Sequence, residues 1–441
     1  MKTANIIIFN ATIVSMNVNF DIYTNAALVI SNSIIVDIGE SEIILSQYDS
    51  SKKIDAKGKI VTPGLVNTHT HSAMTIYRGY ADDLPLKIWL EEHIFPVERK
   101  YTNQYTTRWG AKLAMAEMIQ SGTTTFSDMY YFIDEIAMVA KEIGMRAVLG
   151  EGVLDFPTPN FKTPQESLQY TVNLIQKYKN DALINISFAP HAPYTCSENL
   201  LRQVKKLADE NDAIIQIHLS ETQWEYEHFS QKYNCTPVEY LNQIEFFGGK
   251  TLAAHCVHLS ENDIEIMASH QVGVAHNPEC NMKLASGRMP LEKLWKAGIH
   301  VGLGTDGTAS NNNLNLFAEM HTASLLHKFA LLDASFAGAR DMFEMATIGG
   351  AKALNLDSQI GSIEKGKKAD ILLIDFNKFH LTPIYNIYSH LVYALNSSDV
   401  HTVMIDGQIV YENHNFTNLD ESKIIDEINK IGIKIAANQE I

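Results

Sequence analysis

The sequence predicts an α/β protein built mainly as a (β/α)8 barrel, and three observations support this. Short apolar runs, many of them β-branched, recur along the middle of the chain and are typical of strands buried in a parallel sheet. Stretches with a helical spacing of apolar residues separate these runs, and this alternation favours one barrel over separate domains. Polar residues follow several runs directly, at the strand ends where a barrel gathers its functional groups.

The first run, residues 60–66, leads into the tetrapeptide Thr68-His69-Thr70-His71. Two histidines at positions i and i+2 of an extended segment point to the same face, so they can hold one ion together. Neutral imidazole is a common ligand of catalytic transition metals. Such a pair also occurs on ordinary surfaces, and the downstream residues therefore decide the interpretation.

Later apolar runs end in polar residues in the same way. The runs 183–189, 213–217, 251–254, 272–275 and 299–304 lead to His191, His218, His255, His276 and Asp306. Because the carboxyl ends of barrel strands meet at one rim, we expect these side chains to gather around one site.

The segments between the runs predict helices. They cover residues 103–120, 131–143, 197–211, 289–298 and 314–331. Ser197 is a good N-cap residue and Gly144 a good C-cap residue. A doubly wound sheet is the alternative fold, but it needs a glycine-rich phosphate loop after an early strand, and the sequence has no such motif.

The two ends of the chain have a different pattern, with short alternating runs that predict strands. These runs are 6–9, 27–30, 34–37, 361–363, 369–375 and 401–411. Asp406-Gly407 between two apolar runs predicts a hairpin. Since neither end can form a core alone, we expect residues 1–61 and 361–441 to form one composite β-sandwich with a terminal helix at 420–441, beside a barrel of residues 62–360.

Bulk composition fits a soluble enzyme. A formal net charge of −16 argues against a nucleic-acid partner. The first apolar run is too short for a signal sequence, and no stretch is long enough to predict a membrane span. The cysteines are scattered without a CxxC pair, at Cys196, Cys235, Cys256 and Cys280. Reduced thiols fit a cytoplasmic protein, and a homo-oligomer is left open.

Several stretches make the chain resemble the amidohydrolase superfamily, in its branch of mononuclear metal-dependent deaminases and chlorohydrolases. They are residues 63–71, 79–86, 191–196, 218–221, 304–307 and 361–375. Within that branch the chain most resembles the 5′-methylthioadenosine/S-adenosylhomocysteine deaminase family, through residues 82–86 and 276–287. The resemblance implies a (β/α)8 barrel flanked by a composite β-sandwich.

The resemblance also implies a metal site. Its ligands would be His69, His71, His218 and Asp306. Zinc is the expected ion because it suits a nitrogen-rich site with an open position, and iron(II) is the alternative. Binuclear relatives carry a modified lysine at a barrel strand end, and this chain has none there. We therefore expect one divalent ion per subunit.

The implied reaction is attack of water on C6 of a purine with loss of ammonia, the metal lowering the pKa of the water. Glu221 would carry a proton from the water to the ring nitrogen. His255 would orient the water, and Asp306 would help to pass a proton to the departing amine.

Substrate contacts follow from the same resemblance. Glu98 matches a position that binds the ribose hydroxyls, His191 one that contacts the purine, and Ser310 a polar contact near the metal. Glu221 and Asp306 would also touch the substrate. His258 and His276 are expected either to support the site residues from behind or to be structural.

One position departs from the family pattern. Glu151 stands where many relatives have an arginine that pairs with the amino-acid carboxylate of S-adenosylhomocysteine. Two carboxylates repel each other, so this departure predicts a preference for small neutral 5′ groups, as in 5′-methylthioadenosine or 5′-deoxyadenosine. Arg146, Arg288 or an arginine from another subunit could supply the missing charge.

Three other functions fit parts of the pattern. Deamination of 6-aminodeoxyfutalosine, guanine or another amino-heterocycle would use the same scaffold, and so would dechlorination of a triazine. A non-catalytic role is the third alternative, and the presence of every implied ligand together with Glu221 argues against it.

Overall fold

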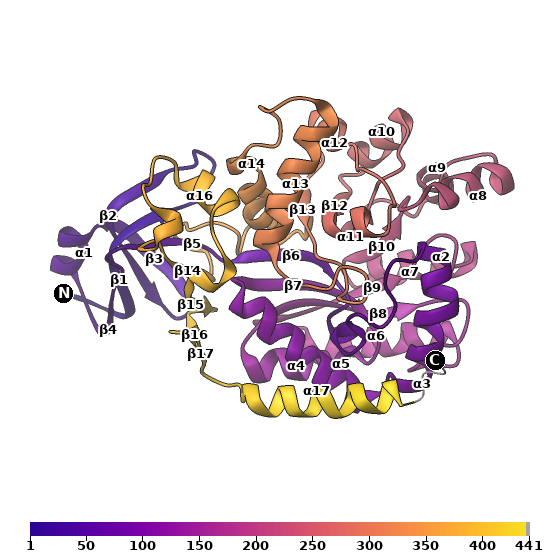
Figure 1. The fold of residues 1–441 in the computed structure, drawn as a ribbon, viewed down its shortest axis with the longest axis horizontal. Coiled ribbons are helices and arrows are strands. Elements are labelled where there is room, and N and C mark those ends of the chain that lie inside the picture. Colours follow the sequence, from indigo (N-terminus) through magenta and orange to yellow (C-terminus); the bar gives the residue numbers. More distant parts are fainter. Residues whose placement is uncertain (438–441) are drawn as a thin grey trace.

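The computed structural model describes residues 1–437, which form two sheets with helices packed around them. The sheet built from the chain ends lies at one end of the elongated molecule, and the barrel lies at the other (Figure 1).

Eight parallel strands form the barrel, in the order β13-β12-β11-β10-β9-β8-β7-β6. They are β6 (Leu65–Thr70), β7 (Thr123–Tyr130), β8 (Arg146–Val153), β9 (Ile184–Pro190), β10 (Ile215–Leu219), β11 (Thr251–His255), β12 (Gly273–His276) and β13 (Val301–Leu303). The first and last strands lie together, because Thr68 Oγ1 donates to the carbonyl of Leu303 over 2.9 Å. The predicted barrel is therefore confirmed.

Helices cover the outside of this sheet. They are α4 (Gln104–Gln120), α5 (Ile133–Ile143), α6 (Pro164–Tyr178), α7 (Glu198–Glu210), α8 (Gln223–Tyr233), α9 (Pro237–Gln243), α10 (Glu261–Ser269), α11 (Pro278–Lys283), α12 (Leu291–Lys296), α13 (Leu316–Leu331), α14 (Ala339–Glu344) and α15 (Gly350–Ala353). Each predicted helix is present with slightly shorter ends. Ser197 caps α7 by accepting the N–H of Leu200, and Gly144 ends α5 with a φ of +89°.

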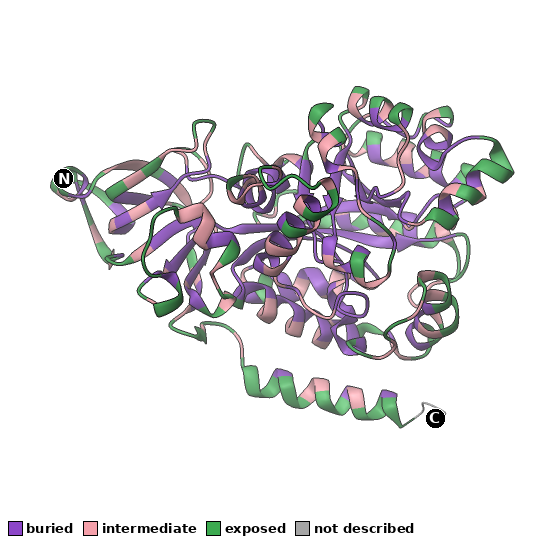
Figure 2. Ribbon diagram, turned by 45° about the horizontal axis from the view of Figure 1, so that its top comes forward, coloured by how far each residue is buried: buried purple, intermediate pink, exposed green. Residues whose placement is uncertain are grey.

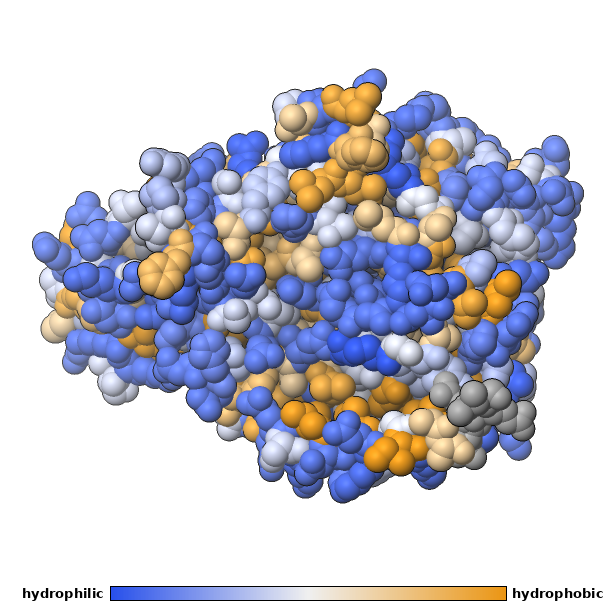
Figure 3. All heavy atoms as spheres, viewed as in Figure 1, coloured by the Kyte–Doolittle hydropathy of each residue, from blue (hydrophilic) through white to orange (hydrophobic). Residues whose placement is uncertain are grey.

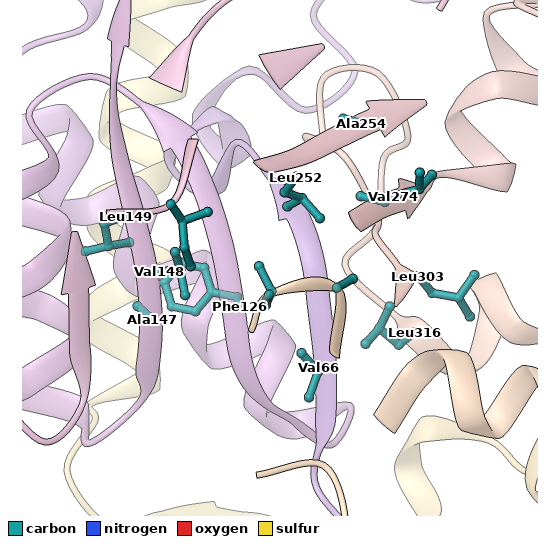
Figure 4. Packing of buried hydrophobic residues seen from close by; sticks show 14 of the residues in the cluster. Val66, Phe126, Ala147, Val148, Leu149, Leu252, Ala254, Val274, Leu303 and Leu316 are labelled. Carbon is teal, nitrogen blue, oxygen red and sulfur yellow. The ribbon is translucent and has the colours of Figure 1, made fainter. Parts of the chain in front are cut away.

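The barrel interior and the space between strands and helices are filled with apolar side chains. Figure 4 shows Val66, Phe126, Val148, Leu252 and Val274 packed together, and all of them are fully buried or nearly so. Burying one such side chain stabilises a fold by roughly 1.5–3 kcal/mol. Figure 2 shows that burial follows the strands and the inner helix faces. The periodic apolar runs thus become this core.

Nine strands form the second sheet, in the order β17-β16-β15-β14-β5-β1-β2-β3 with β4 beside β1. They are β1 (Lys2–Val14), β2 (Ile22–Ser31), β3 (Ile34–Glu40), β4 (Tyr48–Asp55), β5 (Lys59–Pro63), β14 (Ile371–Asp375), β15 (Val400–Ile405), β16 (Gln408–Glu412) and β17 (Asn415–Phe416). Both ends of the chain contribute, as predicted.

Side-chain alternation gives this sheet two covered faces. Ile6 and Ile8 of β1 pack in one cluster with Leu373, whereas Ile7 packs on the opposite face with Ile44 of helix α1 (Ser41–Gln47). The run 361–363 is not a strand.

Asp406 and Gly407 form the predicted turn between β15 and β16, with φ values of 48° and 75°. Positive φ at both positions matches the twist of a tight hairpin.

The two sheets are joined both by the chain itself and by a buried ion pair. Strand β5 of the second sheet passes into β6 of the barrel through Gly64, where a Cβ atom would lie 2.1 Å from Oγ1 of Thr124. Arg146, the first residue of β8, forms a buried ion pair with Asp370 over 2.7 Å. The division between residues 61 and 62 and between 360 and 361 stays a prediction.

The last described helix, α17 (Glu421–Ala436), packs beside α4, and the hydroxyl of Tyr105 bonds to Glu427 (Figure 1). It confirms most of the predicted terminal helix, whose last residues 438–441 lie outside the described chain. The face seen in Figure 3 is mostly hydrophilic, with apolar groups along α17. Among residues 1–437, no helix combines the length and the apolar character that a bilayer crossing requires.

Candidate metal centre and active site

The carboxyl ends of three barrel strands bring the predicted metal ligands together. His69 lies in β6 and His71 follows that strand, His218 lies in β10, and Asp306 follows β13. Nε2 of His71 lies 3.1 Å from Oδ1 of Asp306 and 3.2 Å from Nε2 of His218. Ligand atoms of His69, His71 and Asp306 all lie within 4.8 Å of one another. Residues far apart in the sequence thus converge on one point.

Backbone carbonyls set the orientation of two of these imidazoles. Nδ1 of His71 faces the carbonyl of Met129 at 2.5 Å, and Nδ1 of His218 faces the carbonyl of His191 at 2.7 Å. A carbonyl oxygen only accepts, so each Nδ1 carries the hydrogen and each Nε2 presents its lone pair. This is how metal-binding histidines are commonly oriented.

The ring of His69 supplies a direct test of whether the cluster fits a cation. Both of its nitrogens are buried without a hydrogen-bond partner. An unsatisfied buried polar atom is costly, and a metal ion would satisfy it. Burial lowers the pKa of His69 to about 4, so the ring is neutral and can coordinate. The residues therefore fit a metal.

Asp306 and the neighbouring histidines shift one another's pKa values. Burial opposes ionisation of Asp306, but His69 and His71 lower the pKa of this carboxyl well below its usual range. Burial also opposes the charge on His71, and the hydrogen bond and charge of Asp306 outweigh it, raising the pKa of His71 to about 9. A divalent cation would take the place of this proton.

His255 was predicted only to orient the water, but it lies close enough to the cluster to be a metal ligand as well. It ends β11 with a φ of 72°, and its ring nitrogen lies within 4.8 Å of those of His69 and His218. Its Nδ1 lies 2.9 Å from Oδ1 of Asn281, which leaves Nε2 toward the cluster. The geometry allows both water orientation and coordination.

Glu221 enters the site directly after β10. The turn is held by Ser220, whose φ is 51°, and by Glu225, whose Oε2 accepts the N–H of Glu221 at 3.0 Å. Oε2 of Glu221 lies 3.8 Å from Nε2 of His255. Burial raises the pKa of Glu221, as suits a group that must take up and release a proton.

A cavity with about 710 Å³ of empty space, including its open mouth, lies over the cluster. Its polar lining contains every predicted substrate residue, namely Glu98, His191, Glu221, Asp306 and Ser310. Its apolar wall comes from helix α2 (Leu86–Ile88), the π-helical turn η2 (Trp89–Ile94) and helix α3 (Phe95–Tyr101).

The predicted substrate residues differ in their surroundings. Glu98 is only 4% exposed, and burial raises its pKa to about 7 against opposing contributions from Tyr130 and His71. His191 stays neutral, because burial lowers its pKa to about 3. Ser310 donates to Oδ2 of Asp306 at 3.0 Å, which gives it a contact with a metal-ligand candidate.

Several residues of the site carry no signal in the sequence alone. Cys280 donates its thiol hydrogen to Asp306, and Asn281 orients His255. Both lie in the segment 276–287, which the sequence marked only by family resemblance. The apolar wall formed by residues 86–95 was not predicted either. These contacts cross between loops, so no local periodicity reveals them.

The structure places Glu151 outside the cavity and so corrects its expected effect. Gly150 and Gly152 of β8 face the barrel interior and the cavity, and alternation turns Glu151 toward the helices. There it accepts the N–H of Ile133 at 3.1 Å and a hydrogen bond from Asn160 at 3.0 Å. Direct repulsion between Glu151 and a substrate carboxylate therefore has no structural basis.

The alternative cations are also engaged elsewhere. Arg146 pairs with Asp370 at the opposite end of β8, and Arg288 pairs with Glu292 over 2.7 Å. Neither lines the cavity.

The two histidines expected to be structural lie outside the cavity lining as well. Nε2 of His258 lies 2.7 Å from the carbonyl of Ser286, and Nε2 of His276 lies 3.0 Å from Nε2 of His327.

Comparisons with known proteins agree with this geometry. A model of the amidohydrolase family matches residues 60–410. The 5-methylthioadenosine/S-adenosylhomocysteine deaminase of Syntrophobacter fumaroxidans is 44% identical over 97% of this chain and 98% of that relative. The 5′-deoxyadenosine deaminase of Methanosarcina mazei is 43% identical over 98% and 99%. A crystal structure of an adenosine deaminase from Xanthomonas campestris with bound zinc aligns with a TM-score of 0.97 and 34% identity over 99% of both chains.

Proposed function

The chain belongs to the amidohydrolase family, and from that premise we propose that it hydrolyses the 6-amino group of an adenosine derivative, releasing ammonia and the inosine analogue. One observation carries the proposal. Glu221 stands between the imidazole cluster and a cavity that also holds a buried carboxyl group, that of Glu98. The names of the similar proteins favour 5′-methylthioadenosine, S-adenosylhomocysteine or 5′-deoxyadenosine as the substrate.

A divalent cation would be held by His69, His71, His218 and Asp306, with one ion per subunit. Zinc is favoured over iron(II) because the similar deaminase from Xanthomonas campestris binds it and because imidazole and carboxylate ligands suit it. When bound, the cation would lower the pKa of water enough to supply a nucleophile near neutral pH.

The side chains of this chain perform the proton transfers. Glu221 takes a proton from the attacking water and delivers it to the ring nitrogen beside C6, which makes that carbon electrophilic. His255 fixes the position of the water from its place 3.8 Å from Glu221. Asp306 takes the second proton of the added water from the hydroxyl group formed on C6 and passes it to the departing amine, which leaves as ammonia when the C6–N bond breaks.

Glu98 and His191 hold the nucleoside. A carboxylate can accept from both ribose hydroxyls at once, and this suits the position of Glu98 in the cavity wall. His191 is neutral and contacts the purine ring, and Ser310 adds a polar contact beside Asp306. The apolar wall of residues 86–95 excludes water from the reacting carbon.

The proposal has a small-molecule substrate and water as its partners, with no nucleic acid and no membrane. The cytoplasmic location stays a prediction, and the oligomeric state is open.

A panel of adenosine derivatives tests the proposal. Purified, zinc-loaded enzyme is mixed with 5′-methylthioadenosine, S-adenosylhomocysteine, 5′-deoxyadenosine, adenosine, guanine and a chlorotriazine. Absorbance follows the conversion of adenine to hypoxanthine, and assays of released ammonia and chloride detect turnover of guanine and of the triazine. We expect turnover of adenosine derivatives and release of one ammonia per purine. Turnover of guanine or the triazine without any adenosine derivative would contradict the proposal.

A further inference from the structure

A second, larger hollow opens from the cavity to the surface. It is a groove with about 2380 Å³ of empty space, against about 710 Å³ for the cavity, both including the open mouth. Residues that line both spaces are Leu86, Leu90, Phe95, Tyr194 and Leu284. The two spaces adjoin at these shared residues, so a molecule seated in the cavity can extend into the groove.

The proposed function fixes which part of a substrate points there. The purine must place C6 next to the imidazole cluster, and the ribose hydroxyls lie at Glu98 on α3. The 5′ carbon is the end of the nucleoside farthest from C6, so we expect it to point away from the cluster and toward the residues that the cavity shares with the groove. A long 5′ substituent would therefore enter the groove.

Three side chains from one helical segment line a wall of the groove. Glu91, Phe95 and Arg99 follow one another at intervals of four residues, and all three line the groove. Phe95 also contacts the ring of His191, with 6.3 Å between ring centroids. Phe95 thus lies at the junction of cavity and groove, and an anion and a cation that line only the groove stand four residues before and after it.

Arg99 and Glu91 are both available to a ligand. Both are exposed, and no side-chain hydrogen bond or ion pair joins either of them to another of residues 1–437. The other acidic groups of the groove are engaged: Asp155 accepts from the hydroxyl of Ser197, and Glu198 pairs with Arg202.

The lysines of the groove lie over aromatic rings. Lys87 is 5.1 Å from the ring centre of Trp224, and Lys232 is 4.9 Å from that of Tyr233. Arg99 therefore presents to the groove a guanidinium group that has no competing partner among the described residues.

We propose that this groove is the subsite for a 5′ substituent that ends in an amino acid, with Arg99 binding its carboxylate and Glu91 its ammonium group. A guanidinium binds a carboxylate through two parallel hydrogen bonds, which favours arginine for this task. Phe95 packs against the thioether between the ribose and the amino acid. This inference rests on the proposed function. In it, the amino-acid end of the 5′ substituent does not contact Glu151.

Arg99→Met tests the carboxylate contact, and Lys100→Met is the matched control. Lys100 is the next residue of the same helix, is exposed, and does not line the groove. The measurement is the ratio of kcat/KM for S-adenosylhomocysteine to that for 5′-methylthioadenosine. We expect this ratio to fall roughly 10- to 100-fold in Arg99→Met, mainly through KM, and to stay unchanged in Lys100→Met.

A third substrate separates the carboxylate from the rest of the tail. The decarboxylated analogue, 5′-deoxy-5′-(3-aminopropylthio)adenosine, keeps the amine but has no carboxylate. Its ratio to 5′-methylthioadenosine should stay within about twofold in Arg99→Met and fall in Glu91→Gln.

The outcomes separate the two proposals. Enzyme that deaminates none of the adenosine derivatives contradicts the proposed function. Enzyme that deaminates 5′-methylthioadenosine, but either leaves S-adenosylhomocysteine unchanged or shows the same ratio in Arg99→Met and wild type, overturns the subsite alone. Retention of the ratio in Arg99→Lys above that of Arg99→Met would support a charge contact rather than a packing contact.

Discussion

The thiol of Cys280 donates a hydrogen bond to Oδ2 of Asp306 over 2.7 Å, and both side chains are buried. Ser310 donates to the same oxygen at 3.0 Å. These two donors hold the carboxylate so that Oδ1 faces His71. Cys280 thus helps to fix the position of Asp306, a candidate metal ligand.

Replacing Cys280 should weaken catalysis without removing it. Cys280→Ala deletes one donor to Asp306, and the loss of one hydrogen bond predicts a decrease in kcat of roughly 3- to 10-fold. Cys280→Ser keeps a donor and should retain most of the activity. Steady-state kinetics on 5′-methylthioadenosine measure both variants, and equal activity of Cys280→Ala and wild type would show that the contact has no catalytic effect.

Glu221→Gln should remove the proton shuttle while leaving the cluster intact. Loss of a positioned general acid–base group lowers kcat by roughly 100- to 10,000-fold. Because Glu221 is not among the proposed ligands, metal content should match wild type. Metal analysis by mass spectrometry beside single-turnover kinetics checks this, and a variant with full activity would refute the assignment.

Removing the metal should abolish activity and lower thermal stability. A chelator such as dipicolinate empties the site, and a ligand that binds only the folded state at 1,000 times its Kd stabilises it by about 4.1 kcal/mol. Calorimetry with and without added zinc measures the shift in Tm. His69→Asn should show the low Tm in both conditions, and a zinc-dependent Tm in that variant would argue against His69 as a ligand.

Glu225 should make stability depend on pH. Burial raises the pKa of this carboxyl group to about 8, against backbone hydrogen bonds from Glu221 and Ser220 that lower it. A folded-state pKa above the unfolded value means that the folded state holds the proton more tightly. The contribution of Glu225 is therefore fully present below about pH 4.5 and is lost as the pH rises through 8.

Glu225→Gln removes this titration. The free energy of unfolding of the variant, relative to wild type, should rise between pH 5 and pH 9 in urea titrations. Glu227→Gln, an exposed residue of the same helix, is the control and should follow wild type. Parallel curves for wild type and Glu225→Gln over this range would contradict the prediction.

The ion pair between Arg146 and Asp370 should be important for stability. Both side chains are nearly inaccessible to solvent, and Nε of Arg146 lies 2.7 Å from Oδ2 of Asp370. Removing one partner leaves an unpaired buried charge, so Arg146→Met should destabilise the protein by about 3–5 kcal/mol. The exposed pair of Lys206 and Glu210 is the control, and Lys206→Met should cost less than about 1 kcal/mol in urea unfolding.

Strand-end patterns made much of the fold and of the candidate site predictable. Parallel strands place their carboxyl ends at one rim, so His69, His218 and Asp306 could be expected to meet before any coordinates were known. What could not be predicted depends on contacts between loops. The cavity wall of residues 86–95 and the contact of Cys280 with Asp306 arise from loop conformation, which local spacing does not encode.

Glu151 shows a different limit of sequence reasoning. Its place in the family pattern suggested a side chain beside the substrate, but strand alternation turns it to the helices. The two glycines that flank it face inward, and this alternation was available in the sequence. A residue that occupies a family position can therefore be given the family role only if its side chain points toward the site.

Gly64 is the single residue between β5 and β6, and this short connection limits the movement of the two sheets relative to each other. The strand that ends in His69 is a direct continuation of one paired into the other sheet, and Thr124 leaves no space for a side chain at the junction. No hinge separates the two sheets at that point. The imidazole cluster is therefore carried on a frame that continues directly into the second sheet.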